Sequence, residues 1–551
     1  ERLYARDAFY PGVLAALGHM GYLRDQPVAQ AQWYPLQYNP VTGDVRFYHR
    51  IRARITWDSP SAQKTSPSRY GSSAFENLLK STLVNYPELN RIAPDVNNDI
   101  SKHPGGSKAS TQKKNHSLAP MIDEEGQTAS SHNNPALKIG ITEDGFYKIA
   151  YQNLVKAGWN VSGIDPRNIT MQHRGKETPI IVSGEADGVF HPNDYILFYG
   201  VSQKDIYTNK NVYWLKAGNQ RGKRMTTKDG AISANDVVPD GFPARLHAER
   251  NINYWQAIPH GWGEDHWFWS ILFGSFSRRS YPVAFKNISK KPETATVRVR
   301  LKGYTNDAQL SPDHHTRIYL NGIMIDDQRW EGQTIYDHIA TVPQTSLNEG
   351  ANMVQIERVD DTGAVVDTIW LNWIEIDYVD TYVAEDDSLL FSASQPGDFR
   401  FEIKNFTSNN AEVFDITDPE DVICIKNTTA FKEKGAYTLA FKDMAETQTR
   451  YLALTPLQYK EPEGITPDQP TSWKSPSNGA DYIIITHKDF YARSQKLARY
   501  QRRKGMRVVT IKTEDIYDEF NSGVFHPQAI RDLLSYAYKN WKPPAPAYVA
   551  L

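Results

Sequence analysis

The sequence predicts a multidomain, mostly β chain that is followed by the start of an α/β domain with a parallel sheet. Short runs of alternating apolar and polar residues recur through most of the 551 residues. After residue 476, apolar β-branched runs alternate with helical patterns, which is typical of a parallel sheet. The length corresponds to roughly three or four ordinary domains. We therefore divide the chain into the segments 1–58, 59–135, 136–270, 271–475 and 476–551.

The first segment, residues 1–58, is predicted to be β structure. Residues 39–43 read Asn-Pro-Val-Thr-Gly and predict a hairpin loop. Residues 45–57 alternate with a period of two, which predicts one long strand. Its arginine-rich face is explained either by exposure to water or by docking onto the acidic side of another domain. The arginines of this face are Arg46, Arg50, Arg52 and Arg54.

The second segment, residues 59–135, is predicted to be a flexible polar linker or a lid between modules. Two polar tracts, 59–68 and 104–114, flank one short amphipathic helix predicted at 74–84. We expect limited proteolysis to cut first between Ser59 and Asn134, because an exposed linker is easily cleaved. The lysines that favour cleavage are Lys102, Lys108, Lys113 and Lys114.

The third segment, residues 136–270, is predicted to be β-rich. Strands at 137–142 and 146–150 are joined by a short turn and predict a hairpin, followed by a helix at 151–157. Further strands are predicted at 169–173, 180–184 and 194–200.

Three carboxylates of this segment, Glu185, Asp187 and Asp194, lie close together in sequence around Gly188. They would suit a Ca²⁺ site, although their spacing is not that of an EF-hand. An acidic turn between two strands explains the same pattern without a metal, and we favour that interpretation.

Aromatic residues gather between positions 200 and 270, next to Glu264, Asp265 and His266. This pattern suits a sugar-stacking platform or a metal site. It is equally typical of rings that pack a long connection onto neighbouring sheets, which is the interpretation we favour. The aromatic residues are Tyr213, Trp214, Tyr254, Trp255, Trp262, Trp267, Phe268 and Trp269.

The fourth segment, residues 271–475, is predicted to be a β-sandwich because short strands recur about every ten residues. Asn321 and Gly322 predict a tight hairpin turn. Residues 347–356 and 368–378 resemble strands of galactose-binding-like jelly rolls, a group whose members bind carbohydrate, Ca²⁺ or a neighbouring domain. A proline-rich connector at 461–473 marks the end of this region.

Two features of this region invite a chemical interpretation. Asp313, His314 and His315 suggest a metal site, but adjacent histidines cannot easily hold one ion, so we predict a solvated loop. Cys424 is the only cysteine of the chain and lies in an apolar run. We therefore predict a buried core residue and not a nucleophile, which needs an exposed electropositive site.

The last segment, residues 476–551, alternates strands and helices. Strands are predicted at 482–486, 506–511 and 547–551, and helices at 489–504 and from His526 onward. The final strand is an apolar run with no covering helix after it, so we expect the polypeptide to be the front part of a longer protein. The loops that build a site in such a sheet lie beyond the carboxyl ends of its strands.

Several blocks of this last segment resemble the start of the catalytic domain of gingipain-type cysteine peptidases, which include the sortase-like peptidases of type IX secretion. The resemblance implies a caspase-like α/β domain with a His/Cys dyad. That histidine stands in a Gly-His-Gly motif downstream of the matched blocks, and no catalytic residue can be assigned here. His487 is expected to be structural or supporting. The matched blocks are 481–487, 502–509, 513–520, 527–534 and 543–550.

Residues 22–43 resemble the start of the pro-domain of the same family, and residues 144–149 and 174–200 resemble its pro-domain or N-terminal β-domain. The resemblance implies the N-terminal part of a secreted or cell-surface bacterial cysteine endopeptidase, inactive by itself, whose β modules fold, inhibit or position the catalytic domain. Within the family, a sortase-like processing role stays open. The alternative outside it is a non-catalytic surface adhesion or carbohydrate-binding protein. Expected partners are a protein or peptide substrate, bound through the missing catalytic half, and surface or secretion-system proteins.

Composition limits the remaining choices. A formal net charge of −2 argues against a basic nucleic-acid-binding face. A single cysteine excludes an internal disulfide. The sequence contains no run of about eighteen apolar residues, so we predict no transmembrane helix. No cofactor is expected, apart from the Ca²⁺ considered above.

Overall fold

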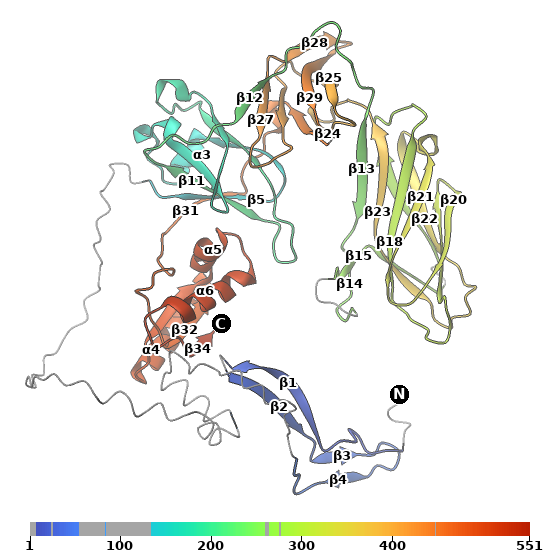
Figure 1. The fold of residues 1–551 in the computed structure, drawn as a ribbon, viewed down its shortest axis with the longest axis vertical. Coiled ribbons are helices and arrows are strands. Elements are labelled where there is room, and N and C mark those ends of the chain that lie inside the picture. The colour runs from blue at the N-terminus through green and yellow to red at the C-terminus, as the bar shows by residue number, and fades with distance from the viewer. Residues whose placement is uncertain are drawn as a thin grey trace, which may run out of the picture. The chain divides into compact units, whose positions relative to one another are not determined.

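The computed structural model describes residues 7–23, 26–53, 83, 134–258, 264–274, 277–446 and 448–551. The chain groups into two compact units, which are described separately. The smaller unit comprises Glu1–Met121, Ser472–Ile516 and Gln528–Leu551, and the larger one comprises Ile122–Thr471 and Tyr517–Pro527. Most of the ribbon in Figure 1 is strand, and the longer helices lie near the C-terminal end. The predicted order of β modules followed by an α/β region is therefore confirmed.

Two antiparallel strand pairs open the smaller unit. β1 (Ala15–Leu23) pairs with β2 (Gln26–Trp33), and β3 (Leu36–Tyr38) pairs with β4 (Val45–Phe47). The side chain of Asn39 accepts hydrogen bonds from the backbone of Val41, at 3.0 Å, and of Thr42, at 3.4 Å. The predicted hairpin loop at 39–43 is thus confirmed.

The long strand predicted at 45–57 is wrong. β4 has three residues, and residues 48–53 form no strand. Val45 and Phe47 are 57% and 59% exposed, so the alternating pattern buries no apolar face here. The physical reason is that β4 pairs, within the described residues, only with the equally short β3. Arg46, Arg50 and Arg52 are exposed, whereas Arg54 and the linker at 59–135, apart from residues 83, 134 and 135, lie outside the described residues.

The first part of the larger unit is a pair of sheets that share one core. Their strand orders are β31-β5-β11-β7-β8 and β6-β10-β9, and the short helix α3 (Tyr151–Lys156) packs on the same core. The strands are β5 (Leu137–Ile141), β6 (Gly145–Ala150), β7 (Ile169–His173), β8 (Lys176–Thr178), β9 (Ile180–Val182), β10 (Tyr195–Gly200), β11 (Asn211–Ala217) and β31 (Gly464–Pro467).

The hairpin predicted between β5 and β6 is wrong, although both strands exist. β5 pairs with β11 and β31, whereas β6 pairs with β10 in the facing sheet. The turn between them carries the chain from one sheet to the other. It does so at Gly145, whose φ of 147° is a backbone conformation that glycine adopts far more readily than other residues.

The second part of the larger unit has the sheets β12-β27-β26-β30-β24 and β25-β29-β28 around an aromatic core that includes Phe391, Phe401, Phe441 and Tyr451. Its strands are β12 (Thr226–Asp229), β24 (Ser388–Ser392), β25 (Gly397–Phe406), β26 (Glu412–Asp415), β27 (Ile423–Lys426), β28 (Thr429–Glu433), β29 (Ala436–Ala445) and β30 (Arg450–Leu454).

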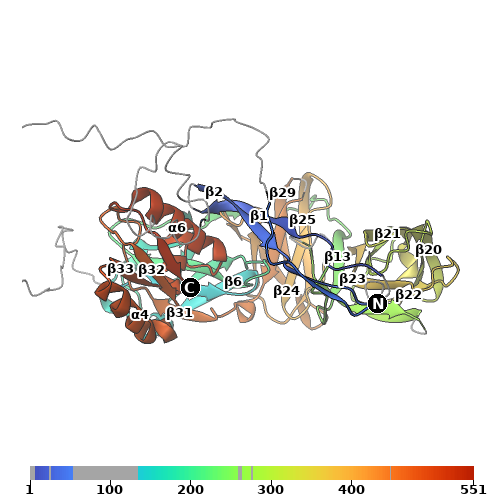
Figure 2. The same cartoon turned by 90° about the horizontal axis from the view of Figure 1, so that it is seen from below.

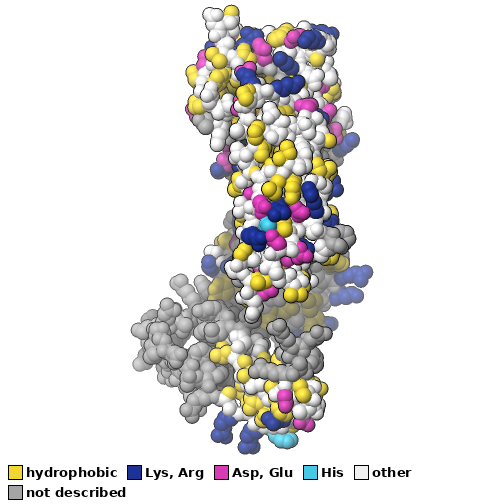
Figure 3. Space-filling model, turned by 90° about the vertical axis from the view of Figure 1, so that its right-hand side faces the viewer, with side chains coloured by type: hydrophobic (Ala, Val, Ile, Leu, Met, Phe, Trp, Pro, Cys, Tyr) yellow, Lys and Arg dark blue, Asp and Glu magenta, His cyan; other side chains and the backbone are white. Residues whose placement is uncertain are grey.

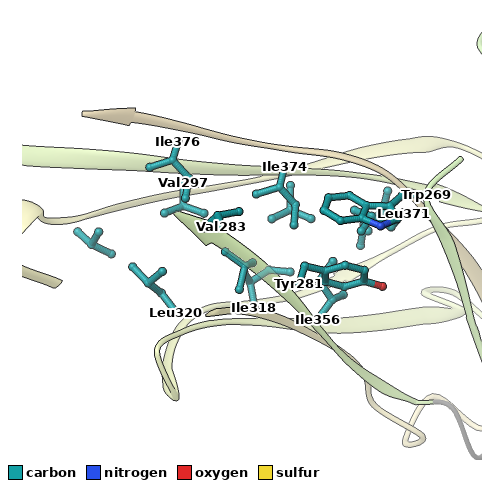
Figure 4. Packing of buried hydrophobic residues seen from close by; sticks show 14 of the residues in the cluster. Trp269, Tyr281, Val283, Val297, Ile318, Leu320, Ile356, Leu371, Ile374 and Ile376 are labelled. Carbon is teal, nitrogen blue, oxygen red and sulfur yellow. The ribbon is translucent and has the colours of Figure 1, made fainter. Parts of the chain in front are cut away.

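The third part is a β-sandwich of the sheets β13-β23-β18-β21, to which β16 adds, and β17-β22-β19-β20. Figure 4 shows apolar side chains of both sheets, such as Ile374 and Ile318, meeting in one core. The predicted turn at Asn321 and Gly322 is confirmed, since both have positive φ between β19 and β20. The strands are β13 (Phe242–Glu249), β16 (Ser270–Phe273), β17 (Arg278–Phe285), β18 (Thr294–Gly303), β19 (His314–Leu320), β20 (Ile323–Trp330), β21 (Ile335–Pro343), β22 (Gly350–Arg358) and β23 (Thr368–Asp380).

Strand pairing crosses the sequence-based boundary at residue 270. β13 and β16 both pair with β23, so the sandwich begins before that boundary. β12 pairs in parallel with β27, which makes the sandwich an insertion into the second part. β14 (Asn253–Tyr254) and β15 (Trp267–Phe268) form a short hairpin. In the chain this hairpin lies between the sandwich strands β13 and β16.

The α/β region of the smaller unit is a parallel sheet in the order β33-β32-β34. The predicted strands and helices at 482–504 and 506–551 are confirmed, with bounds that shift by one or two residues. The strands are β32 (Tyr482–Thr486), β33 (Val508–Lys512) and β34 (Tyr548–Ala550), and the helices are α4 (Tyr491–Arg503), α5 (Thr513–Asn521) and α6 (Pro527–Asn540).

The helix α5 was not predicted, although its residues belong to a matched block. It begins directly after β33, and its residues 517–521 group with the larger unit. Across the described ranges, we find no helix with the length and apolar character that a membrane span requires.

Candidate functional site

The carboxyl edge of the parallel sheet is the candidate functional site. β33 lies on one side of β32 and β34 on the other, so right-handed crossovers place α4 and α6 on opposite faces of the sheet. Figure 2 shows this arrangement, with α4 and α6 on opposite sides of β32 and β33. In such sheets ligands bind beyond the carboxyl ends of the strands at the switch point, which here lies between β32 and β34.

His487 follows β32 directly and begins the short 3₁₀ helix η7 (Lys488–Phe490). Its Nδ1 accepts a hydrogen bond from the backbone N–H of Asp489, at 3.3 Å. Its Nε2 lies 3.3 Å from Oε1 of Glu514, which stands in the first turn of α5 at the end of the neighbouring strand β33. Nδ1 also lies 3.4 Å from Oδ2 of Asp489, so the imidazole stands between two carboxylates.

This imidazole–carboxylate pair is open to solvent, since the side chain of His487 is 48% exposed and that of Glu514 31%. The two groups come from the ends of adjacent strands, so the sheet itself sets their distance. The pair places an imidazole and a carboxylate side by side at the sheet edge. It supplies no nucleophile, and the only cysteine in the sequence is Cys424.

Aromatic and charged side chains surround the pair. Phe490 is 63% exposed, and its ring centroid lies 6.2 Å from that of His487. Lys512, the last residue of β33, places its Nζ 5.7 Å from the ring centroid of Tyr491 and 3.9 Å from Oδ1 of Asp515. The edge therefore combines apolar surface with both signs of charge.

The opposite, amino-terminal edge of the sheet is held by one arginine. Arg507 precedes β33 and binds Asp481, before β32, through Nη2 at 2.9 Å and through its backbone N–H at 2.8 Å. The same Nη2 donates to the carbonyl of Pro544, before β34, at 2.6 Å. Burial raises the pKa of Asp481, but the hydrogen bonds and charge of Arg507 outweigh this effect and lower it. All three strands are therefore aligned by one ionised cluster.

Cys424 is a buried core residue, as predicted. It lies in β27 with 1% of its surface exposed, and burial raises the pKa of its thiol against the opposing effect of Lys426. A thiol of this kind is a poor nucleophile.

Each carboxylate considered for Ca²⁺ has a protein partner. Glu185 pairs with Arg224 at 2.7 Å, Asp187 with His191 at 3.0 Å, and Asp194 accepts the backbone N–H of His191 at 2.7 Å. Among the residues that the structure describes, no group of three or more His, Cys, Asp or Glu side chains is arranged to hold a metal ion.

The solvated loop predicted for residues 313–315 is wrong. His314 and His315 open β19 and are 0% and 3% exposed, and Asp313 is 1% exposed. His314 Nδ1 binds Asp367 at 2.6 Å, whereas the two ring nitrogens of His315 bind Asp361 at 2.6 Å and Asp327 at 2.5 Å. Carboxylate partners make burial tolerable, and neighbouring positions in a strand point their side chains to opposite faces.

Most aromatic residues between 200 and 270 pack as predicted. Tyr213, Trp255 and Phe268 are nearly fully buried, and Trp255 and Phe268 form a cluster with Trp370. Tyr254 and Trp267 stay about half exposed, and Trp262 lies outside the described residues. Glu264 lies 3.6 Å from Lys302, and Asp265 accepts a hydrogen bond from Asn372 at 3.1 Å.

Several charges on the surface of the sandwich are paired. Asp377 binds Arg245 at 2.6 Å and Arg298 at 2.5 Å, and Arg300 binds Asp337 at 2.7 Å. Figure 3 shows one side of the molecule, on which Lys and Arg side chains are interspersed with Asp and Glu side chains.

The β modules followed by a parallel sheet with helices define a multidomain, mostly β chain that ends in an α/β region. Residues 475–551 match the model of peptidase family C25, and residues 1–92 match the C25 propeptide. The two matches assign residues 475–551 to this gingipain-type family of cysteine peptidases and residues 1–92 to its propeptide.

Relatives of known name agree with this assignment. The chain is 36% identical over 93 residues to gingipain R2 of Porphyromonas gingivalis, which is 16% of this chain and 12% of that protein. It is 32% identical over 91 residues to gingipain R1 of the same organism, which is 16% of this chain and 9% of that protein. The chain therefore covers only a small part of the length of these relatives.

The fold is also similar to a solved structure, that of dimeric latent PorU from Porphyromonas gingivalis. The superposition has a TM-score of 0.55 with 14% sequence identity, and it covers 74% of this chain and 39% of the PorU chain. At this identity the similarity concerns the fold alone.

Proposed function

We propose that this chain is the N-terminal part of a secreted or cell-surface cysteine endopeptidase of the gingipain type. In this proposal the region from 475 onward supplies the first strands of a caspase-like α/β domain, and the β modules fold, inhibit or position that domain. The observation that carries the proposal is the C25 peptidase match on a parallel sheet whose carboxyl edge is open and lined by His487 and Glu514.

The reactive thiol comes from sequence outside residues 1–551. Cysteine peptidases attack the scissile carbonyl with a thiolate and need a base nearby. Cys424 is buried in a β-sheet of the larger unit, and its raised pKa disfavours the thiolate. The pair of His487 and Glu514 then supports the edge on which the reactive groups and the peptide substrate meet.

The segment Tyr517–Pro527 groups with the larger unit and contacts its strands β5 and β11. Lys138 of β5 forms an ion pair with Asp518 at 2.7 Å, and Trp214 of β11 donates its indole N–H to the carbonyl of Ser522 at 2.8 Å. A Cβ added at Gly523 would lie 2.9 Å from Val212, so the backbone approaches the sheet closely. These contacts hold the segment 517–527 on the first part of the larger unit.

Within the family, a sortase-like processing role is a second proposal, which rests on the family resemblance of the last segment. The partners would then be exported proteins and components of a secretion system. A non-catalytic surface adhesion protein with the same modules is the competing function, and the assay below separates the two.

The test compares the 551-residue polypeptide with the longest product of its gene in a peptide-hydrolysis assay under reducing conditions. We expect no thiol-dependent hydrolysis by the 551 residues and clear hydrolysis by the longer product. Cys424→Ala should change neither result. A longer product without thiol-dependent hydrolysis would support the adhesion alternative and contradict the proposal.

A further inference from the structure

A pocket of about 240 Å³ lies on the sandwich, on the face of the sheet β13-β23-β18-β21 that points away from the core. The register places Lys302 of β18 opposite both Ile335 and Trp370. These side chains share one face, whereas the adjacent Leu301 and Leu371 belong to the core. The residues 264–268, which lead into and form β15, supply the other wall through Glu264, Asp265 and Phe268.

The pocket holds buried polar groups whose hydrogen-bonding capacity is only partly used. Lys302 is 6% exposed, and its Nζ lies 3.6 Å from Oε2 of Glu264, which is longer than a hydrogen bond. Asn372 is 7% exposed and donates its Nδ2 to Asp265, yet its Oδ1 has no hydrogen-bond partner in the described structure. Buried polar atoms without partners are rare and call for a ligand or ordered water.

The charges that line the pocket favour a neutral ligand. Arg300 is already bound in a bidentate manner by Asp337, at 2.8 and 2.7 Å, and lies over the ring of Trp373. The remaining charges are the carboxylates of Glu264 and Asp265 and the ammonium of Lys302. An anion would face two carboxylates, and a cation would face a buried ammonium. A hydroxyl group avoids both conflicts, because it accepts from Lys302 and donates to a carboxylate or to Asn372.

Aromatic side chains add apolar surface beside these groups. Phe268 lines the pocket and lies 5.4 Å, centroid to centroid, from Trp370. Tyr304 follows β18, is 42% exposed and lies 6.0 Å from the ring centroid of Trp370. Ligand sites usually combine apolar and aromatic walls with a few placed polar groups, and this volume lies below their usual range of about 300–1,000 Å³. The size therefore suits one sugar ring.

We propose that this pocket binds a neutral saccharide unit of monosaccharide size. Lys302 and Asn372 would hold its hydroxyls from the sheet, and Asp265 and Glu264 would accept hydrogen bonds from the opposite wall. The sugar is either free or the terminal unit of a glycan. This site lies in the larger unit and does not depend on the proposed peptidase function.

The experiment is a binding measurement on the full 551-residue chain by saturation-transfer NMR and calorimetric titration. The probes are neutral hexoses, pentoses and N-acetylhexosamines, together with their methyl glycosides. We expect millimolar binding of at least one sugar, weakened about 10-fold by Lys302→Met and by Asn372→Ala. Lys290→Met and Asp360→Asn, at exposed positions, serve as matched controls and should bind within about 2-fold of the wild type.

Circular dichroism of each variant establishes that it is folded. Binding of methyl glycosides identifies the end of a glycan as the source, and binding of the free reducing sugar alone identifies a monosaccharide. The proposal is overturned if no sugar binds at up to about 50 mM, or if folded pocket variants bind as well as the controls. It is also overturned if inorganic phosphate or spermidine displaces the sugar, since charged ligands should not fit.

Discussion

His314 and His338 lie in the same β-sandwich but have different electrostatic surroundings. Burial opposes protonation of His314, but the hydrogen bond to Asp367 and the charges of Asp367 and Asp313 outweigh it and raise its pKa. His338 is bound by Asp326 at 2.7 Å and by the hydroxyl of Thr316 at 2.7 Å. There burial dominates and lowers the pKa of the imidazole.

These directions predict opposite effects of pH on stability. His314 contributes its full share to the free energy of unfolding below its pKa in the unfolded chain, which is about 6.5. This stabilisation is lost as the pH rises through the raised pKa of the folded protein. We expect His314→Gln to lower the free energy of unfolding more at about pH 5.5 than at about pH 8.5. Denaturant titrations at the two pH values measure this difference.

His338→Gln is the matched comparison for this experiment. Its neutral form is favoured in the fold, so its contribution is complete above about pH 6.5 and is lost as pH falls through the lowered pKa. The variant should therefore lose more stability at high pH than at low pH. The same pH trend in both variants would contradict the assignment of the two environments.

Sequence patterns predicted the burial of an apolar side chain but not the partners that bury a charged one. The apolar neighbours of Cys424 were sufficient to predict its burial. The same reasoning failed for His314 and His315. Their partners Asp367 and Asp361 lie 53 and 46 positions away in sequence, and the second partner of His315, Asp327, lies 12 positions away. Pairing between distant strands, which no local pattern records, decides whether a charged side chain can be buried.

At the scale of elements, Asp481, Arg507 and Pro544 tie the amino ends of β32, β33 and β34 together. The aspartate side chain is only 15% exposed, so its hydrogen bonds to Arg507 are partly shielded from water. Hydrogen bonds to charged groups in such places stabilise by about 1.5–3 kcal/mol. This cluster fixes the register of the sheet whose other edge carries His487.

We expect Asp481→Asn to lower the free energy of unfolding of the chain's α/β region by about 1–3 kcal/mol, because one ionised partner of Arg507 is lost. Hydrogen exchange of the β32 and β33 amides reports this change. Asp532→Asn, at an exposed position of α6, is the control and should shift stability by less than about 0.5 kcal/mol. Equal effects of both variants would show that the cluster is not stabilising.

Elements with a strong local signal were predicted, and those fixed by distant pairing were not. β32 and α4 follow from an apolar β-branched run and a helical repeat that ends at Gly505. α5 escaped prediction because most of its residues are polar, with few apolar positions such as Ile516 to mark a buried face. The strands β5 and β6 were predicted, but their placement in facing sheets depends on β11 and β10.

At the scale of the whole molecule, the proposed role of the β modules depends on the segment Tyr517–Pro527. Lys138 and Asp518 are 22% and 14% exposed at their side chains, so their ion pair is partly desolvated. Breaking a pair of this kind leaves an uncompensated charge near the surface of β5, which costs more than the loss of an exposed pair.

We expect Lys138→Met to increase the hydrogen-exchange rate of the segment 517–527 about 10-fold, because the ion pair to Asp518 no longer holds it. Lys216→Met, at an exposed position of β11, is the control and should leave exchange there unchanged. Unaltered protection in Lys138→Met would mean that this pair does not position the connection.

The most direct test of the central claim is to map a thiol-directed peptidase probe by mass spectrometry on the longest folded product of the gene. The account predicts one adduct, on a cysteine outside residues 1–551, and none on Cys424. An adduct on Cys424 in the folded protein would contradict the assignment as a cysteine peptidase whose reactive thiol lies outside residues 1–551. The absence of any adduct, in a product that binds the peptide portion of the probe, would contradict it as well.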